Sequence, residues 1–134
     1  MDDFGGYMKV YFVTQKNMGE FTILKPRKPE SAPDYEGNQS RICVSTSILG
    51  ALSSIGRNLY LGCRTYIYVC ELDESEIIQP NNSINDIDMT GELWILIEKE
   101  FKLHKIIKLN SVNSFSIDDE KETEIYNFEF DIVA

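Results

Sequence analysis

Two short segments of the chain carry side chains whose types and spacing could do chemistry. In the first, Ser45, Thr46 and Ser47 follow a β-rich run and precede a helix-like run. Hydroxyls and free backbone N–H groups at the start of a helix can bind an anion, such as a phosphate or a nicotinamide dinucleotide. The same residue types are good helix N-caps, so anion binding and simple capping both remain open at this level.

The second segment is residues 90–94 (TGELW), where Glu92 opens an apolar run directly after Gly91. A carboxylate beside Trp94 is expected to be partly desolvated, with a pKa raised toward the range of general acid–base groups. An exposed glutamate at the end of a strand is the plain alternative.

Basic side chains flank a long irregular stretch, residues 29–40 (PESAPDYEGNQS). Arg27 and its lysine neighbours precede the stretch and Arg41 follows it, so they could receive a phosphate or could simply be solubilising charges. The prolines and the glycine of the stretch exclude regular secondary structure. Loops of this length are often lids or binding loops, although a loop without function is an equal alternative.

The elements that must position these groups can be read from the hydrophobic period. Apolar residues at positions 48, 49, 52 and 55 predict one helix face, with the serines as caps and Gly56 as a stop. Apolar and β-branched runs predict strands at residues 8–15, 21–24, 41–45, 64–72, 92–97, 105–109 and 126–132. In the last run apolar and acidic or amide residues alternate, which predicts one buried and one solvent-facing side.

These elements predict an α+β fold in a single domain over residues 1–134. It has a mainly antiparallel or mixed sheet of six to eight strands and one principal helix at residues 47–55.

The net charge of -9 is uneven: residues 1–67 carry eight Lys/Arg against six acids (+2), and residues 68–134 carry five Lys against sixteen acids (-11). No basic face is evident, so duplex nucleic acid is not an expected partner. The acidity indicates either solubility or a surface that engages a basic groove on another protein.

The cysteines and the histidine argue against metal and triad chemistry. Cys43, Cys63 and Cys70 are odd in number, lack a Cys-x-x-Cys spacing and lie in apolar runs, as reduced core thiols do. His104, between two predicted strands, is the only histidine, so neither a zinc site nor a nucleophile–histidine–acid set is expected. No segment has the length of a membrane helix and the N-terminus does not resemble a signal peptide, which predicts a cytoplasmic protein without a membrane partner.

Taken in order, several segments over residues 8–109 resemble the small ADP-ribosyltransferase-like domains. They are YFVT at 11–14, LKPR at 24–27, ICVSTS at 42–47, YIYV at 66–69, the Ile-Ile-x-Pro stretch at 77–80, and GELW at 91–94.

The resemblance implies an NAD ligand and assigns roles to residues of this chain. Ser45, Thr46 and Ser47 correspond to the serine motif of the nicotinamide pocket, and Glu92 to the glutamate that stabilises the cationic ribose or orients the acceptor. The remaining NAD contacts would come from the pyrophosphate partners Arg27 or Arg41 and from Tyr11 and Thr14 on the first strand. Phe12 stands where the family has His or Arg, and Thr90 where it has an acidic or amide residue. These departures predict that the shape is kept while the activity is lost or altered.

A second resemblance, in size, composition and acidity, is to small accessory proteins of phages and mobile elements, including anti-CRISPR-like inhibitors of bacterial defence systems. Two hypotheses follow. The chain is an NAD-dependent ADP-ribosyltransferase that modifies a host or defence-system protein. Alternatively, it is a non-enzymatic acidic inhibitor that blocks such a protein or sequesters a nucleotide.

Overall fold

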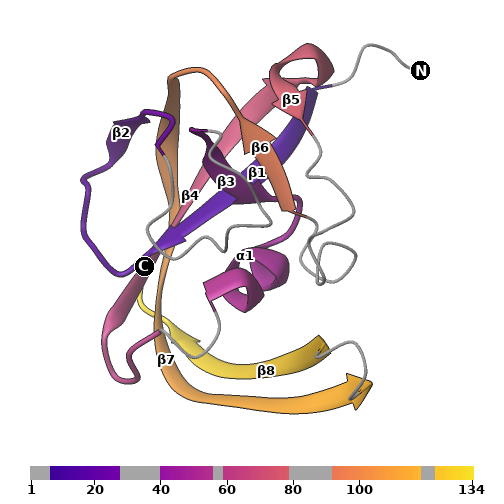
Figure 1. Cartoon of the computed structure of the whole chain (residues 1–134). Coiled ribbons are helices and arrows are strands. Elements are labelled where there is room, and N and C mark those ends of the chain that lie inside the picture. Colours follow the sequence, from indigo (N-terminus) through magenta and orange to yellow (C-terminus); the bar gives the residue numbers. More distant parts are fainter. Residues whose placement is uncertain (1–6, 28–39, 56–58, 79–91, 119–122) are drawn as a thin grey trace.

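In the described part of the chain, eight strands form one sheet in which every paired neighbour is antiparallel. The computed structural model describes residues 7–27, 40–55, 59–78, 92–118 and 123–134. The strands are β1 (Tyr7–Thr14), β2 (Phe21–Leu24), β3 (Ile42–Ser45), β4 (Arg64–Asp73), β5 (Ile77–Ile78), β6 (Glu92–Ile95), β7 (Lys99–Asp118) and β8 (Thr123–Ile132). Their order is β2-β7-β4-β1-β3-β6-β5, and β8 also pairs with β7 (Figure 1). The described part of the chain has one α-helix, α1 (Ile48–Ile55), and a short 3₁₀ turn at Glu74–Glu76. The antiparallel sheet with one principal helix agrees with the prediction.

β1 lies inside the sheet and has a buried residue on each of its faces. Its sequence, YMKVYFVT, is rich in the β-branched and aromatic residues that suit a pleated surface. Val10 and Val13, which point to opposite faces, are both buried. This strand is therefore covered on both sides at its centre.

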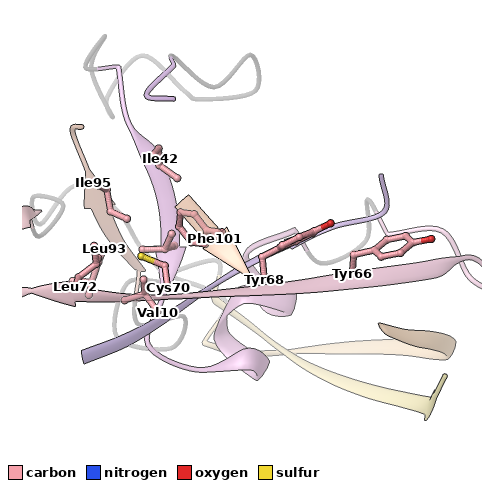
Figure 2. Packing of buried hydrophobic residues seen from close by; sticks show 10 residues of the cluster. Val10, Ile42, Tyr66, Tyr68, Cys70, Leu72, Leu93, Ile95 and Phe101 are labelled. Atoms are coloured by element: carbon pink, nitrogen blue, oxygen red, sulfur yellow. The ribbon is translucent and has the colours of Figure 1, made fainter. Parts of the chain in front are cut away.

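The face that carries Val10 is a closed apolar layer (Figure 2). Its buried members come from five strands: Val10, Ile42, Val44, Tyr66, Tyr68, Cys70, Leu72, Leu93, Ile95 and Phe101. The ring of Phe12 packs against that of Phe101 at 6.3 Å between centroids. Tyr68, though polar, is fully buried, and its hydroxyl donates to the Gly19 carbonyl at 2.8 Å and accepts from the Met18 amide at 3.0 Å. We call this side of the sheet the core face.

The opposite side, which we call the helix face, is covered in part by α1. Ser47 caps this helix, because its Oγ accepts from the Gly50 amide at 2.9 Å. Ala51 and Leu52 pack with Val13. The β7–β8 part of the sheet curves beneath the helix, so α1 lies between β1 and this curved part (Figure 1). The prediction was wrong for Leu49, which is exposed, because the helix turns Ala51 rather than Leu49 toward the sheet.

β7 is much longer than predicted and contains the histidine that the sequence placed between two strands. Tyr68 pairs with Leu103 and Ile67 with Lys105, so His104 is an extra residue in β7. Such a bulge breaks the two-residue period, which is why the sequence pattern indicated a gap.

Two further sequence predictions, a buried apolar side along β8 and a core position for all three cysteines, were wrong because some of these residues lie at the surface of the fold. In β8, Phe128 is half-buried against the α1 cluster, but Phe130 and Ile132 are 45% and 62% exposed, since only part of this strand reaches the helix. Cys63 is exposed in the turn before β4, whereas Cys43 is half-buried and Cys70 buried; all three are free thiols. The predicted irregular stretch apart from Ser40, the predicted helix stop at Gly56 and the departure at Thr90 lie outside the described residues. Across the described chain, no helix has the length and hydropathy needed to cross a membrane.

Candidate functional site

Three of the predicted site residues lie in one row across neighbouring strands. Tyr11 of β1 is the register partner of Ser45 of β3, and Ser45 is the register partner of Glu92 of β6. Direct partners in antiparallel strands project to the same face with their Cβ atoms about 5 Å apart. The side chains of Tyr11, Ser45 and Glu92 therefore adjoin on the helix face, although they are far apart in the sequence.

This register changes which first-strand residue belongs to the site. Phe12 pairs with Tyr68 and packs in the core face, so its side chain points away from Ser45. Tyr11, whose ring and hydroxyl can contact a polar ligand, faces the row instead. The departure noted at Phe12 therefore concerns a core position rather than a position beside Ser45 and Glu92.

Glu92 is half-buried and is held by its own strand. The Trp94 indole Nε1–H donates to Glu92 Oε2 at 2.7 Å, a contact that residues two apart on one strand face can make. A hydrogen bond to a carboxylate is shorter and stronger than one between neutral groups. The alternative of an exposed strand-end glutamate is wrong, because the carboxylate is partly enclosed and oriented.

Arg41 packs on the ring of Trp94. Its guanidinium carbon lies 4.1 Å from the centroid of the Trp94 ring, which is a cation–π contact, and the residue is only 2% exposed. Arg27 pairs with Arg41 through backbone hydrogen bonds of 3.1 and 2.9 Å, and its side chain is exposed. The two arginines proposed for the pyrophosphate are thus paired through their backbones. The Arg27 side chain is open to solvent, whereas the Arg41 side chain is buried against the Trp94 ring.

The serine motif joins the row to the helix. Ser45 is 2% exposed and its Oγ accepts from the Ser47 amide at 3.4 Å, while Ser47 caps α1. Thr46 and Ser47 are exposed. The capping interpretation is confirmed for Ser47, and the anion-binding interpretation of this segment stays a prediction.

Thr14, the remaining predicted contact, is not brought to the row. It pairs with Tyr66 of the core face, three positions along β1 from Tyr11. Its Oγ1 accepts from the Lys16 amide at 3.1 Å, which closes the end of the strand. The alternation of side chains along β1 is the reason that Tyr11 and Thr14 point to opposite faces.

His104 is an exposed residue that lies next to the row. Its ring packs on that of Tyr11 with centroids 5.9 Å apart and the planes tilted by 59°. Desolvation lowers the pKa of His104, and the neighbouring charges of Lys105 and Lys9 lower it further. Its status as the only histidine was a signal, but nothing local in the sequence placed it beside Tyr11.

The described residues include no group of three or more His, Cys, Asp or Glu side chains arranged to hold a metal ion. No protein-family model matches the chain, nor does any curated protein or solved structure. The chemistry of the site therefore has to be argued from its own geometry: a partly enclosed, oriented carboxylate, a buried serine hydroxyl and a tyrosine in one row at the start of a helix.

Proposed function

We propose that the row Tyr11–Ser45–Glu92 binds the nicotinamide-ribose end of an NAD-type dinucleotide, and that Glu92 promotes ADP-ribosyl transfer to a protein of a host or defence system. The observation that carries the proposal is the direct cross-strand partnership of Ser45 and Glu92. The resemblance in the sequence gave these two residues roles in one pocket, and the register makes them neighbours.

The chemistry that the row would support is the exchange of one bond at the ribose C1′ atom. The bond to the nicotinamide nitrogen breaks and its electron pair leaves with the nicotinamide, so positive charge develops on the ribose. A nucleophile of the acceptor protein then forms the new bond to C1′ and loses its proton. A fixed carboxylate beside the ribose stabilises that charge without needing to reorganise. The bond from Trp94 to Oε2 supplies such fixation for Glu92.

The other two members of the row suit the neutral part of the same ligand. An aromatic ring such as that of Tyr11 offers a face against which a flat heterocycle can pack. The buried Ser45 hydroxyl accepts from the Ser47 amide and so holds the start of α1 beside the place of the carboxamide. The half-buried position of Tyr11 and Glu92 is consistent with ligand access from the uncovered part of the helix face.

The test is NAD turnover and transfer of labelled ADP-ribose into a host lysate, with the whole chain and its Glu92→Gln variant. We expect Glu92→Gln to lower turnover by about 10²–10³-fold, the range for removing one preorganised electrostatic group. Glu98→Gln is the matched control, because Glu98 is an exposed carboxylate 3.9 Å from Lys25. Equal turnover by wild type and Glu92→Gln, or no turnover by wild type, would overturn the proposal.

A second candidate function, binding of a basic partner protein, is favoured by the composition of β8. Among the described strands it pairs with β7 alone, and it exposes the carboxylates Glu129 and Asp131 together with the apolar Phe130 and Ile132. Glu129 accepts from the Ser111 hydroxyl at 2.8 Å and Asp131 from the Asn110 amide at 3.0 Å, so both are held in place. A strand with acidic and apolar side chains can serve as an interaction edge.

This alternative is separated from the enzyme by its dependence on charge. Partner binding through β8 should weaken with salt and be lost in the Glu129→Lys/Asp131→Lys double variant, whereas NAD turnover should be unchanged. A complex that survives both treatments would contradict an acidic docking edge at β8.

A further inference from the structure

On the same face of the sheet, the row of the candidate site continues beyond Tyr11 toward the edge formed by β2. Tyr11 is the register partner of Val69 on β4, Val69 of Lys102 on β7, and Lys102 of Phe21 on β2. A groove of 420 Å³ lies over these strands, and its lining includes Lys9, Phe21, Val69, Glu71, Glu100 and Lys102. The groove reaches β1 itself, because Lys9 lies two residues before Tyr11 on the same face of that strand.

The groove has two exposed cations close to the row, whereas Arg41 is buried against Trp94. Lys9 and Lys102 are both exposed and both line it, and Lys9 lies near enough to His104 to affect its pKa. The lining pairs these two lysines with two glutamates, Glu71 and Glu100, so an anion would be held by the individual ammonium groups and not by a net positive field. A lysine ammonium binds phosphate as a point charge through charge-assisted hydrogen bonds.

The other side chains of the groove suit a nucleoside. The Phe21 side chain is 55% exposed on the edge strand β2, where a base can stack on its face. Glu71 is the register partner of Lys9, and Glu100 is the register partner of Ile23. Carboxylates in this position can accept hydrogen bonds from ribose hydroxyls, as acidic residues do in other dinucleotide sites.

The dimensions also match a two-part ligand. Ser45 and Lys102 are three strand spacings apart, roughly 14 Å at about 4.8 Å per strand. Glu92 adds one more spacing, which gives roughly 19 Å. One dinucleotide can bridge such a span, whereas a mononucleotide occupies only one end of it.

We propose that this groove binds the adenosine diphosphate end of the dinucleotide, with Lys9 and Lys102 on the phosphates and Phe21 on the adenine. The proposal rests on the proposed function for its ligand, and it assigns an orientation along the row: nicotinamide toward Glu92 and adenine toward β2. It also moves the phosphate contact away from Arg27 and Arg41.

The experiment measures the affinity of the whole chain for ADP, which lacks the nicotinamide end, by calorimetry. Lys102→Gln should weaken ADP binding about tenfold, the loss of one charge-assisted hydrogen bond at an exposed site, and Lys102→Arg should restore most of it. Lys108→Gln is the control, because Lys108 is an exposed lysine of the same strand outside the groove lining. Phe21→Ala should also weaken binding, whereas Ile23→Ala, at an exposed residue of the same strand face, should not.

The outcomes separate this proposal from the proposed function. ADP binding that is sensitive to Lys102→Gln but not to Lys108→Gln supports the groove, whether or not NAD is consumed. NAD turnover that depends on Glu92 while Lys102→Gln and Phe21→Ala leave ADP and NAD binding unchanged overturns the groove alone. Absence of ADP binding by the wild type also overturns the groove proposal. Equal losses of ADP affinity from Lys102→Gln and Lys108→Gln would show a general charge effect, and they too overturn the proposal.

Discussion

The two faces of β1 carry opposite kinds of chemistry. On the core face, Val10 and Phe12 are part of a closed apolar layer. On the helix face, Lys9 and Tyr11 adjoin titratable and hydroxyl groups of neighbouring strands, and α1 covers only the part near Val13. A period of two residues thus assigns neighbouring positions of one strand to different faces, and only the helix-face positions away from α1, Lys9 and Tyr11, remain available to a ligand.

The comparison also shows where polar groups are tolerated. In the core face the Tyr68 hydroxyl is satisfied by two backbone groups of the turn before β2. On the helix face the polar groups contact one another or remain open to solvent, as in the Trp94–Glu92 pair and the groove. Substitutions in the core face, or in the part of the helix face that packs under α1, should therefore change stability. Substitutions in the open part of the helix face should change ligand chemistry.

The largest expected effect is from Phe101→Ala in the core face. Phe101 is fully buried against Phe12, so truncation should lower the free energy of unfolding by about 3–5 kcal/mol. Denaturant titration measures the change. Phe130→Ala, at an exposed position of β8, should change it by no more than about 0.5 kcal/mol. Similar losses for both variants would remove the distinction between the two positions.

Tyr68→Phe should have the next largest effect on stability. It removes one hydroxyl and leaves the Gly19 carbonyl and the Met18 amide without that partner, at a cost of about 1–3 kcal/mol. Tyr60→Phe is the control, since Tyr60 is largely exposed. If thermal or denaturant unfolding gives the same stability for both variants, the buried hydroxyl does not hold the turn.

Trp94→Phe tests the helix face by a change in turnover. The variant keeps an aromatic ring beside Arg41 but loses the N–H that orients Glu92, so turnover should fall about tenfold, which corresponds to the roughly 1.4 kcal/mol of a charge-assisted bond. A double-mutant cycle with Glu92→Gln measures the coupling between the two substitutions in turnover. A purely structural role of Trp94 would give no such coupling. Because Trp94 acts through Glu92, Trp94→Phe should add no further loss in the Glu92→Gln background; additive losses would contradict this.

The smallest effect expected is a pH dependence at His104. Its pKa in the folded chain is below the ordinary value of 6.5, so the unfolded chain binds the proton more readily. The contribution to stability is therefore fully present above pH 6.5 and is lost as pH falls through the lower folded pKa. His104→Gln should flatten the stability curve in that window.

The titration of His104 can be followed directly by NMR, because the chain has one histidine. Lys105→Gln should raise the pKa of His104, since the charge of Lys105 lowers it. Lys108→Gln, three residues further along β7, is the control and should leave the titration in place.

Local patterns in the sequence predicted much of the fold. The helix with its serine cap follows from a period and a capping residue within one segment, and β2 was predicted with the observed bounds, Phe21–Leu24. Errors arose where tertiary packing overrides pattern. The bulge at His104 interrupts the period of β7, Leu49 points outward on α1, and Phe130 lies beyond the reach of the helix.

The sequence by itself determined which residue types were available for chemistry, because a serine cap and a glutamate beside a tryptophan are local features. Only the tertiary structure decided which of them meet. The register of β1, β3 and β6 joins Tyr11, Ser45 and Glu92 and sends Phe12 and Thr14 to the other face. Strand register between distant segments is set by packing of the whole sheet, and a shift of one residue would reverse every assignment.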